Sequence, residues 1–236
     1  MKRVKMVLGA LLSVAVFTFV VFMGIAIWNK KAQENVYVAA MEEFREAINA
    51  DKTDIDKITE LANQVKSDGY YAYIEQAAKC YIYDTFVPYF SAIELQENGL
   101  FKDGVTATLI EAERPDFGNS LTSIAKMKEY ANLISKAANT IFSREDALDY
   151  LESGLSDYYI ALFDEQVEEI YNNPELKQNY LNYAAAMQQK SDAYVEVINF
   201  LKANKNYWHI QNDTISFKTT ALTNQYNQLL AKIGQK

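Results

Sequence analysis

An uncharged run of 23 residues, from Met6 to Trp28, constrains the fold of this chain more than any other feature of the sequence. At about 1.5 Å per helical residue, the run is roughly 35 Å long, which is enough to cross a hydrocarbon core of about 30 Å with some tilt. It therefore predicts a transmembrane helix over residues 6–28, with Trp28 as an aromatic anchor at the membrane–water interface.

Basic residues are unevenly distributed around this run. Three precede it, together with the α-amino group, and two follow it. They are Lys2, Arg3 and Lys5 on one side and Lys30 and Lys31 on the other. The positive-inside bias predicts that residues 1–5 form a cytoplasmic tail and that residues 32–236 lie outside the cytoplasmic membrane.

A cleavable signal peptide and a lipoprotein signal are the alternatives to an anchor. A signal peptide would have an apolar stretch of about 7–15 residues and a small-x-small cleavage site. The stretch here is longer, and Ala26 and Ala32 lie among bulky and charged residues. A lipoprotein would need a cysteine just after the run, whereas the one cysteine is Cys80. The sequence favours an uncleaved signal anchor and leaves cleavage as an open alternative.

Residues 32–236 predict a single acidic domain of about 205 residues, large enough to bury a core. This part holds all 31 acidic residues and 18 of the 23 basic ones, so its formal charge is 18 − 31 = −13. Such a charge argues against a nucleic-acid partner and against lying flat on anionic lipid. One cysteine excludes an intrachain disulfide. Cys80 is expected to be a packed small side chain, with an intermolecular disulfide as the alternative.

Few residues that break helices occur in this domain. The chain has three prolines and eight glycines, which is few for a β-rich domain. We expect helices over residues 33–50, 53–67 and 70–95, the last kinked at Pro88, then a loop over 96–119 with a short ordered piece at 106–113, and further helices that begin near Asn119, Ser143, Ser156 and Asn173, the last ending near Ala203.

Two of these helices show their buried faces in the sequence, because apolar residues recur in steps of three and four. The first face comprises Ile124, Met127, Ala131, Ile134, Ala138 and Ile141, and the second Tyr180, Ala184, Met187, Ser191, Tyr194, Ile198 and Leu201. Start signals accompany them and their neighbours: a capping-box pattern at Ser143–Asp146, and Asn173 followed by a proline.

The C-terminal part changes to a period of two, which is typical of strands. Residues 207–211 and 214–218 flank Asn212-Asp213, a sequence that suits a tight hairpin turn. In this register Trp208 lies opposite Phe217, and Ile210 lies opposite Ile215. A last amphipathic helix is expected to cover the apolar face of the hairpin; its apolar positions are Leu222, Tyr226, Leu229 and Ile233. The predicted fold class is all-α: one transmembrane helix, then a helical bundle with a hairpin at about 207–218.

Few residues of this chain suit chemistry. His209 is the one histidine, and it falls on the polar face of the predicted hairpin. With one histidine and one cysteine, the common zinc and di-iron patterns do not arise. The sequence therefore predicts no catalytic, cofactor-binding or metal-binding residues, and no cofactor.

Two acidic clusters are candidates for a metal site. Asp51, Asp54, Asp56 and Glu60 lack the glycine and ligand spacing of an EF-hand loop, and are interpreted as acids at a helix start. The second cluster comprises Asp164, Glu165, Glu168 and Glu169. A solvated helix face is the favoured interpretation of this cluster, with a weak divalent-cation patch as the alternative.

The 17 tyrosines are the most unusual feature of the composition. Five of them could line a groove for a peptide or a glycan, since tyrosine has an apolar face and a polar tip. These are Tyr70, Tyr71, Tyr73, Tyr158 and Tyr159. We favour the simpler interpretation, in which most tyrosines fill a helical core and their hydroxyls reach the surface.

The C-terminal part resembles a known family. The order is a helix that ends in residues 198–201 (INFL), then residues 208–217 (WHIQNDTISF), then residues 225–230 (QYNQLL). It resembles the YiaF-like bacterial envelope proteins, a mostly helical family of unknown function, over roughly residues 190–231. Family members are lipoproteins, whereas this chain lacks the anchoring cysteine. The resemblance implies a bacterial envelope protein, held here in the cytoplasmic membrane, and it brings no catalytic residues.

These observations predict a non-enzymatic protein. We expect a single-pass, membrane-anchored, extracytoplasmic interaction or scaffold module of the bacterial cell envelope, with an envelope protein as its partner. The alternative is a domain that binds or senses a small ligand, such as a metabolite, peptide or glycan. An enzyme is the third possibility and rests only on Glu165, Glu168 and Glu169.

Overall fold

The computed structural model of the protein describes residues 28–50 and 54–234. The transmembrane helix predicted over residues 6–28 lies outside this part, except for Trp28. Among the helices in the described ranges, none combines the length and the hydropathy needed to span a membrane. The described chain is mostly helical and ends in one antiparallel two-stranded sheet and a last helix. The predicted helical domain with a small C-terminal hairpin is confirmed.

Residues 28–50 are helical and are called the N-terminal segment below. The following elements are α2 (Ile55–Asn63), α3 (Tyr70–Asn98), α4 (Ala107–Glu113), α5 (Gly118–Thr140), α6 (Arg144–Leu148), α7 (Asp157–Tyr171), α8 (Pro174–Ala203), β1 (Trp208–Gln211), β2 (Thr214–Phe217) and α9 (Thr220–Lys232).

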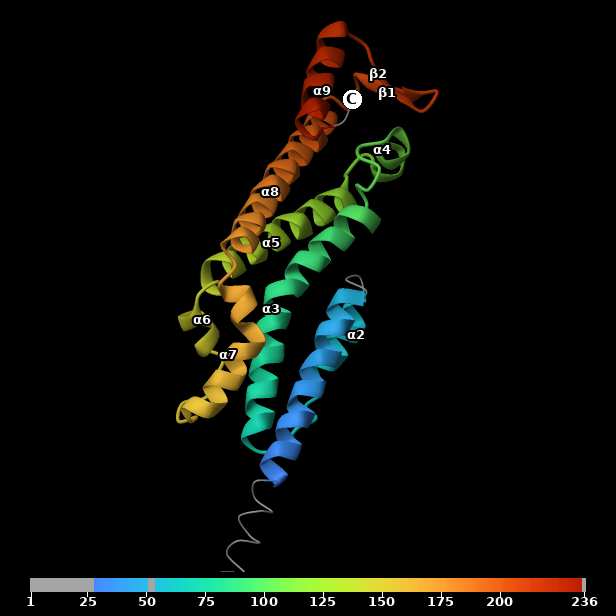
Figure 1. Ribbon diagram of the computed structural model, residues 1–236. Helices are drawn as coiled ribbons and strands as arrows, with labels where there is room; N and C mark the ends of the chain where they lie inside the picture. Colours follow the sequence, from blue (N-terminus) through green and yellow to red (C-terminus); the bar gives the residue numbers. More distant parts are fainter. Residues whose placement is uncertain (1–27, 51–53, 235–236) are drawn as a thin grey trace, which may run out of the picture.

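The long helix α3 is the spine of an elongated domain (Figure 1). The N-terminal segment and α2 lie on one side of its first half, and α7 lies on the other. Helix α5 packs against both α3 and α8, and its contact with α8 is more extensive than its contact with α3. The hairpin and α9 follow α8 at the end of the domain opposite to the start of the N-terminal segment.

Both predicted helical stripes are confirmed, because every residue in them is buried. The helix starts are largely confirmed as well. The side chains of Asp54, Ser143 and Asn173 accept hydrogen bonds from the backbone N–H groups three residues later, at 2.9 to 3.1 Å. Pro174 opens α8. Ser156 precedes α7 without a side-chain cap bond.

The predicted helix over 53–67 is wrong at its C-terminal end. Helix α2 ends at Asn63, and Gln64 is already extended, with φ −89° and ψ 112°. Gly69 directly precedes α3 with a φ of 60°, in the left-handed region that glycine adopts without strain. The helix stops early because the next backbone N–H groups bind a buried carboxylate on α3.

That carboxylate belongs to Glu75. It accepts hydrogen bonds from the backbone N–H of Lys66 at 3.0 Å, the backbone N–H of Ser67 at 2.9 Å and the Ser67 hydroxyl at 2.6 Å. One turn later on α3, the Lys79 ammonium lies 2.7 Å from the carboxylate and donates to the Gln64 carbonyl at 2.6 Å. Both charged side chains are at most 1% exposed. The pair therefore ties the α2–α3 connection to the spine.

The predicted hairpin register is confirmed: Trp208 pairs with Phe217 and Ile210 with Ile215. The Trp208 indole donates to the Leu201 carbonyl at 2.9 Å, which fixes the hairpin to the end of α8. Phe217 lies 5.1 Å from the Tyr226 ring of α9, measured between centroids. Helix α9 thus covers the apolar face of the hairpin. This packing stabilises the hairpin, because an isolated two-stranded hairpin is only marginally stable in water.

Replacing Lys79 by methionine is expected to destabilise the domain strongly. The substitution leaves the Glu75 carboxylate buried without its cation, which costs about 3–5 kcal/mol in comparable cases. The control is Lys232→Met, which breaks an exposed ion pair with Glu196 and is expected to cost at most about 1 kcal/mol. Urea unfolding of the full chain, followed by circular dichroism, measures both values. Equal losses would show that the buried pair is not the stronger constraint.

The same carboxylate predicts an acid dependence. Burial raises the pKa of Glu75, but the hydrogen bonds from Lys79, Ser67 and Lys66 outweigh it, so the pKa is lowered from its ordinary value of 4.5. A lowered pKa in the folded state contributes stability above pH 4.5, and this contribution is lost as the pH falls below that value through the folded-state pKa. Glu75→Gln is expected to show a shallower loss of stability below pH 4.5 than the wild type, measured by urea unfolding at several pH values.

Candidate functional site

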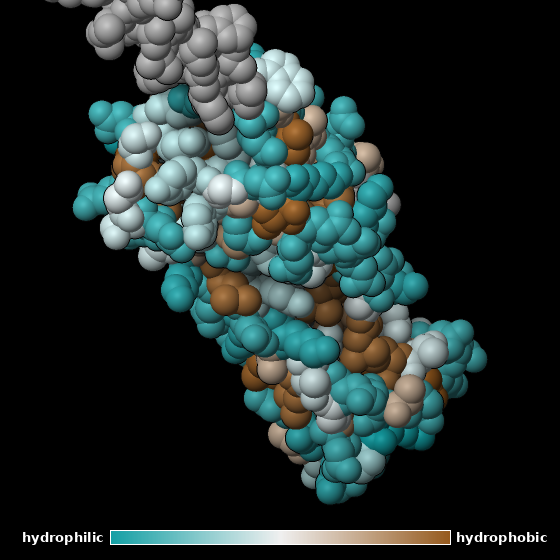
Figure 2. Space-filling view, turned by 90° about the horizontal axis from the view of Figure 1, so that it is seen from below, coloured by the Kyte–Doolittle hydropathy of each residue, from teal (hydrophilic) through white to brown (hydrophobic). Residues whose placement is uncertain are grey.

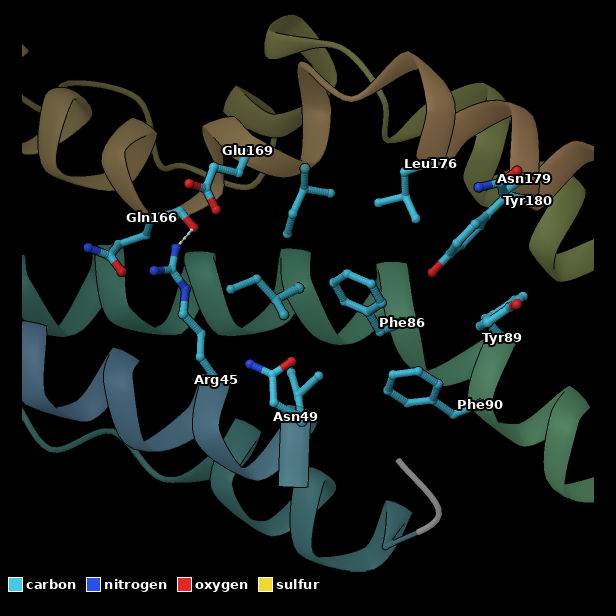
Figure 3. Close-up of a pocket in the computed structure, with 13 residues that line it drawn as sticks. Arg45, Asn49, Phe86, Tyr89, Phe90, Gln166, Glu169, Leu176, Asn179 and Tyr180 are labelled. Carbon is cyan, nitrogen blue, oxygen red and sulfur yellow. Dashed lines mark hydrogen bonds between the residues drawn. The ribbon is translucent and has the colours of Figure 1, made fainter. Parts of the chain in front are cut away.

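A cleft of about 380 Å³ lies between the N-terminal segment, α3, α7 and α8. Figure 3 shows it as an elongated space with polar side chains toward one end and aromatic rings toward the other. Its volume is within the range of small-molecule sites, about 300–1,000 Å³, and is too small for a whole partner helix, whose diameter is about 10–12 Å.

The aromatic end is built by spacing on α3. Phe86, Tyr89 and Phe90 are three and four residues apart, so they project from one side of the helix. Tyr180 of α8 faces them, with its ring stacked on Tyr89 at 5.0 Å between centroids. The Tyr180 hydroxyl donates to the Thr85 carbonyl at 3.0 Å. This bond orients the ring and satisfies its polar tip inside the domain.

The polar end combines groups from the N-terminal segment and α7. Arg45 of the N-terminal segment donates to the backbone carbonyl of Gln166 on α7. Glu169 lies one turn further along α7 and is exposed, as is Asn49 at the rim. Asn179 is also exposed at the rim, but it lies beside Tyr180 at the aromatic end. Figure 3 shows Arg45 and Glu169 at the same end of the cleft.

The charges at this end contrast with the neutral aromatic end. Burial, assisted by neighbouring Tyr89, raises the pKa of Tyr180 well above its ordinary value of 10, so its hydroxyl stays neutral. Arg45 supplies a guanidinium, which suits a carboxylate because its N–H groups form a planar fork. Chemically, the cleft can hold an apolar body at one end and a charged or hydrogen-bonding head at the other.

The five tyrosines of the candidate peptide or glycan groove lie elsewhere, at the end of the domain where the N-terminal segment begins. They do come together: the hydroxyls of Tyr71 and Tyr158 lie 3.1 Å apart, and the rings of Tyr70 and Tyr159 lie 5.2 Å apart. Seven tyrosines have their rings in the core, which confirms that part of the interpretation: Tyr37, Tyr71, Tyr81, Tyr171, Tyr180, Tyr194 and Tyr226. The expectation that the hydroxyls reach the surface is wrong for Tyr81 and Tyr180, whose hydroxyls donate to buried backbone carbonyls. Tyr70, Tyr73 and Tyr207 are exposed.

The described members of the two acidic clusters have separate surroundings. Asp164 pairs with Arg144 of α6 at 2.6 Å, while Glu165, Glu168 and Glu169 are exposed on α7. Asp54 caps α2, and Asp51 lies outside the described residues. In the part of the chain that the structure describes, no group of three or more histidine, cysteine or acidic residues is placed to hold a metal ion. His209 is exposed on the hairpin, on the face predicted.

Sequence reasoning did not find the cleft, because its walls come from four elements and no short pattern links them. It also missed the buried pair of Glu75 and Lys79. A signal for that pair exists: a glutamate and a lysine four residues apart stand in a run of apolar residues, where neither charge could be left unpaired.

Comparisons with known proteins give no further assignment: no protein-family model, no curated protein and no solved structure matches the chain. The class that the geometry defines is an elongated helical domain with a small-molecule-sized cleft between four of its elements.

Replacing Arg45 by alanine is expected to loosen the N-terminal segment from α7. A hydrogen bond to a charged donor contributes about 1.5–3 kcal/mol, so unfolding should require that much less free energy. Amide hydrogen exchange should increase in residues 42–50 and near Gln166. Lys57→Ala, at an exposed position of α2, is the control and should leave both regions unchanged. Unchanged exchange in Arg45→Ala would mean that the contact does not hold the cleft together.

Proposed function

We propose that the protein is a membrane-anchored extracytoplasmic module of the bacterial cell envelope that binds an envelope partner and is not an enzyme. The observation that carries the proposal is the continuity of the chain. The uncharged run at 6–28 leads directly into the N-terminal segment, which packs along α3 as part of the domain. An anchor of this kind would hold the whole domain at the membrane.

Three further observations support this proposal. The basic residues around the run favour the cytoplasmic membrane, with residues 32–236 outside it. The resemblance of residues 190–231 to YiaF-like proteins supports the bacterial envelope as the setting. A cytoplasmic tail of five residues is too short to transmit a signal by itself, so an output would pass through a partner.

In-cell photo-crosslinking of the full-length protein tests the proposal. A photoreactive residue is placed at Asn179, on the rim of the cleft, and separately at Asp213, in the hairpin turn at the far end of the domain. Both positions are exposed, so neither substitution disturbs the core. A reproducible envelope protein crosslinked from one position and not the other would support a defined partner surface. The absence of any crosslink to another protein from either position would contradict the interaction module.

The cleft favours a second candidate function, the binding of a small ligand. Its aromatic end and the Arg45 guanidinium fit a carboxylate that carries an apolar body, since the guanidinium can bind a carboxylate through two hydrogen bonds. The exposed Glu169 beside Arg45 adds a site for an ammonium group, as in a free hydrophobic amino acid.

A thermal-shift measurement tests this second candidate on the full chain in lipid nanodiscs. The probes are medium-chain fatty acids, hydrophobic amino acids and their N-acetylated forms. Saturation at 100 times Kd is expected to stabilise the protein by about 2.7 kcal/mol, seen as a higher Tm. The shift should disappear in Arg45→Met and persist in Lys177→Met, a control on α8 outside the cleft. No shift with any of these probes would count against a carboxylate ligand.

A further inference from the structure

Exposed aromatic side chains gather at the end of the domain where the N-terminal segment begins. Trp28 is 72% exposed, Tyr70 is 56% exposed and Tyr73 is 49% exposed. Trp28 belongs to the first described turn of the N-terminal segment, whereas the two tyrosines belong to the first turn of α3. Large aromatic side chains left in water at one place indicate a surface that is covered in the working protein.

A specific contact places the start of α3 near Trp28. Gln33 accepts a hydrogen bond from the backbone N–H of Asp68 at 3.0 Å, just before α3 begins. Gln33 is five residues beyond Trp28, a rise of about 7.5 Å along a helix. The start of α3 therefore lies within about two helical turns of Trp28, and Figure 1 shows these chain segments meeting at the same end.

The start of α7 joins them at this end. The Lys30 ammonium lies 3.5 Å from the ring centre of Tyr158, and the Tyr158 hydroxyl donates to the Glu34 carboxylate. The Tyr70 ring packs on Tyr159 at 5.2 Å between centroids. In Figure 2 a group of pale side chains, of near-neutral hydropathy, lies at the end of the domain that is toward the top of the view.

Tyrosine and tryptophan are the side chains enriched where a membrane meets water, because an apolar ring and a polar group suit the headgroup level. We infer that this end of the domain is seated on the membrane, with Trp28, Tyr70 and Tyr73 in the lipid interface. The inference rests on the proposed anchor, whose uncharged run ends at Trp28. The occupant of this surface is therefore the bilayer that the same chain crosses.

The charges at this end define the lipid chemistry. Lys30 and Lys31 lie here, but Asp68 and Asp157 lie here too, at the starts of α3 and α7. The surface is therefore aromatic rather than cationic, and a zwitterionic lipid such as phosphatidylcholine is sufficient for it. Only the end of this acidic domain touches the membrane, which avoids repulsion from anionic lipid along its length.

With this end on the membrane, the orientation of the rest of the domain follows. The hairpin and α9 are at the opposite end and project away from the membrane (Figure 1). Arg45 is 17 residues beyond Trp28 on the N-terminal segment, which places the polar end of the cleft about 25 Å along the helix from the membrane surface. The cleft therefore opens above the lipid, where a soluble ligand or an envelope partner can reach it.

Tryptophan quenching by lipid tests the inference with the full chain in phosphatidylcholine vesicles. A fraction of the lipid carries a nitroxide near the headgroup, which quenches nearby tryptophans. The chain has two tryptophans, Trp28 and the buried Trp208 at the far end. Trp28→Phe leaves Trp208 as the baseline. Tyr73→Trp and Tyr207→Trp are then made separately in that background. They are matched, because Tyr73 is 49% and Tyr207 is 52% exposed, at opposite ends of the domain.

The expected result is strong quenching of Trp28 in the wild type and of the tryptophan at position 73, with none at position 207. Quenching of Trp28 without position 73 would overturn the seat and leave the anchor standing. The emission of the tryptophan at position 73 could instead depend on the protein-to-lipid ratio and not on the nitroxide. That result would mean that a second copy of the chain covers this surface, and it would also overturn the seat on the membrane. Quenching at both positions would mean that the domain lies on its side, which also overturns the seat. An unquenched Trp28, with release of the protein by alkaline carbonate, would overturn the anchor itself.

Discussion

The buried ion pair between Glu75 and Lys79 holds the half of the domain that carries the candidate sites. Moving two charges out of water is costly, so such a pair persists only where further hydrogen bonds satisfy it. Here the backbone of Lys66 and Ser67, the Ser67 hydroxyl and the Gln64 carbonyl all contribute. The connection between α2 and α3 must therefore be extended, which ends α2 early and places it against the spine.

The same ion pair also contacts the N-terminal segment, which forms one wall of the cleft. The Lys79 ammonium lies 5.9 Å from the ring centre of Phe44, a fully buried residue of the N-terminal segment. The next residue is Arg45, whose guanidinium binds the Gln166 carbonyl across the cleft. One polar cluster on α3 thus fixes the height at which the N-terminal segment sits, and with it the geometry of both the cleft and the aromatic end.

Tyrosine suits the narrow core of an elongated helical domain. A thin domain has little interior, so its core side chains lie close to backbone groups and to the surface. A tyrosine supplies a large apolar ring and a hydroxyl that can bond to such groups. Tyr37, Tyr81 and Tyr180 each donate to a backbone carbonyl far away in the sequence, at 2.9 to 3.1 Å. The acceptors are Leu162 on α7, Ile141 directly after α5, and Thr85 on α3. These hydrogen bonds connect neighbouring helices without burying additional charges.

Most of the fold could be predicted from the sequence, because its signals are local. The stripes on α5 and α8, the caps at Ser143 and Asn173 and the register of the hairpin depend on residues a few positions apart, and all are confirmed. The end of α2 could not be predicted in the same way. Its residues suit a helix, but hydrogen bonds from Lys66 and Ser67 to Glu75, eight or nine residues away on another helix, override that preference.

The sequence by itself determined the uncharged run, the acidic helical domain and the period-two hairpin, since each follows from the spacing of residue types along the chain. The tertiary structure alone decided which tyrosines are buried, where Arg45 meets α7 and which aromatic residues share one end. These features join residues as far apart as 121 positions for Arg45 and Gln166, and 124 for Glu34 and Tyr158. No local pattern encodes such distances, because they arise only when the packing of whole helices sets their relative heights.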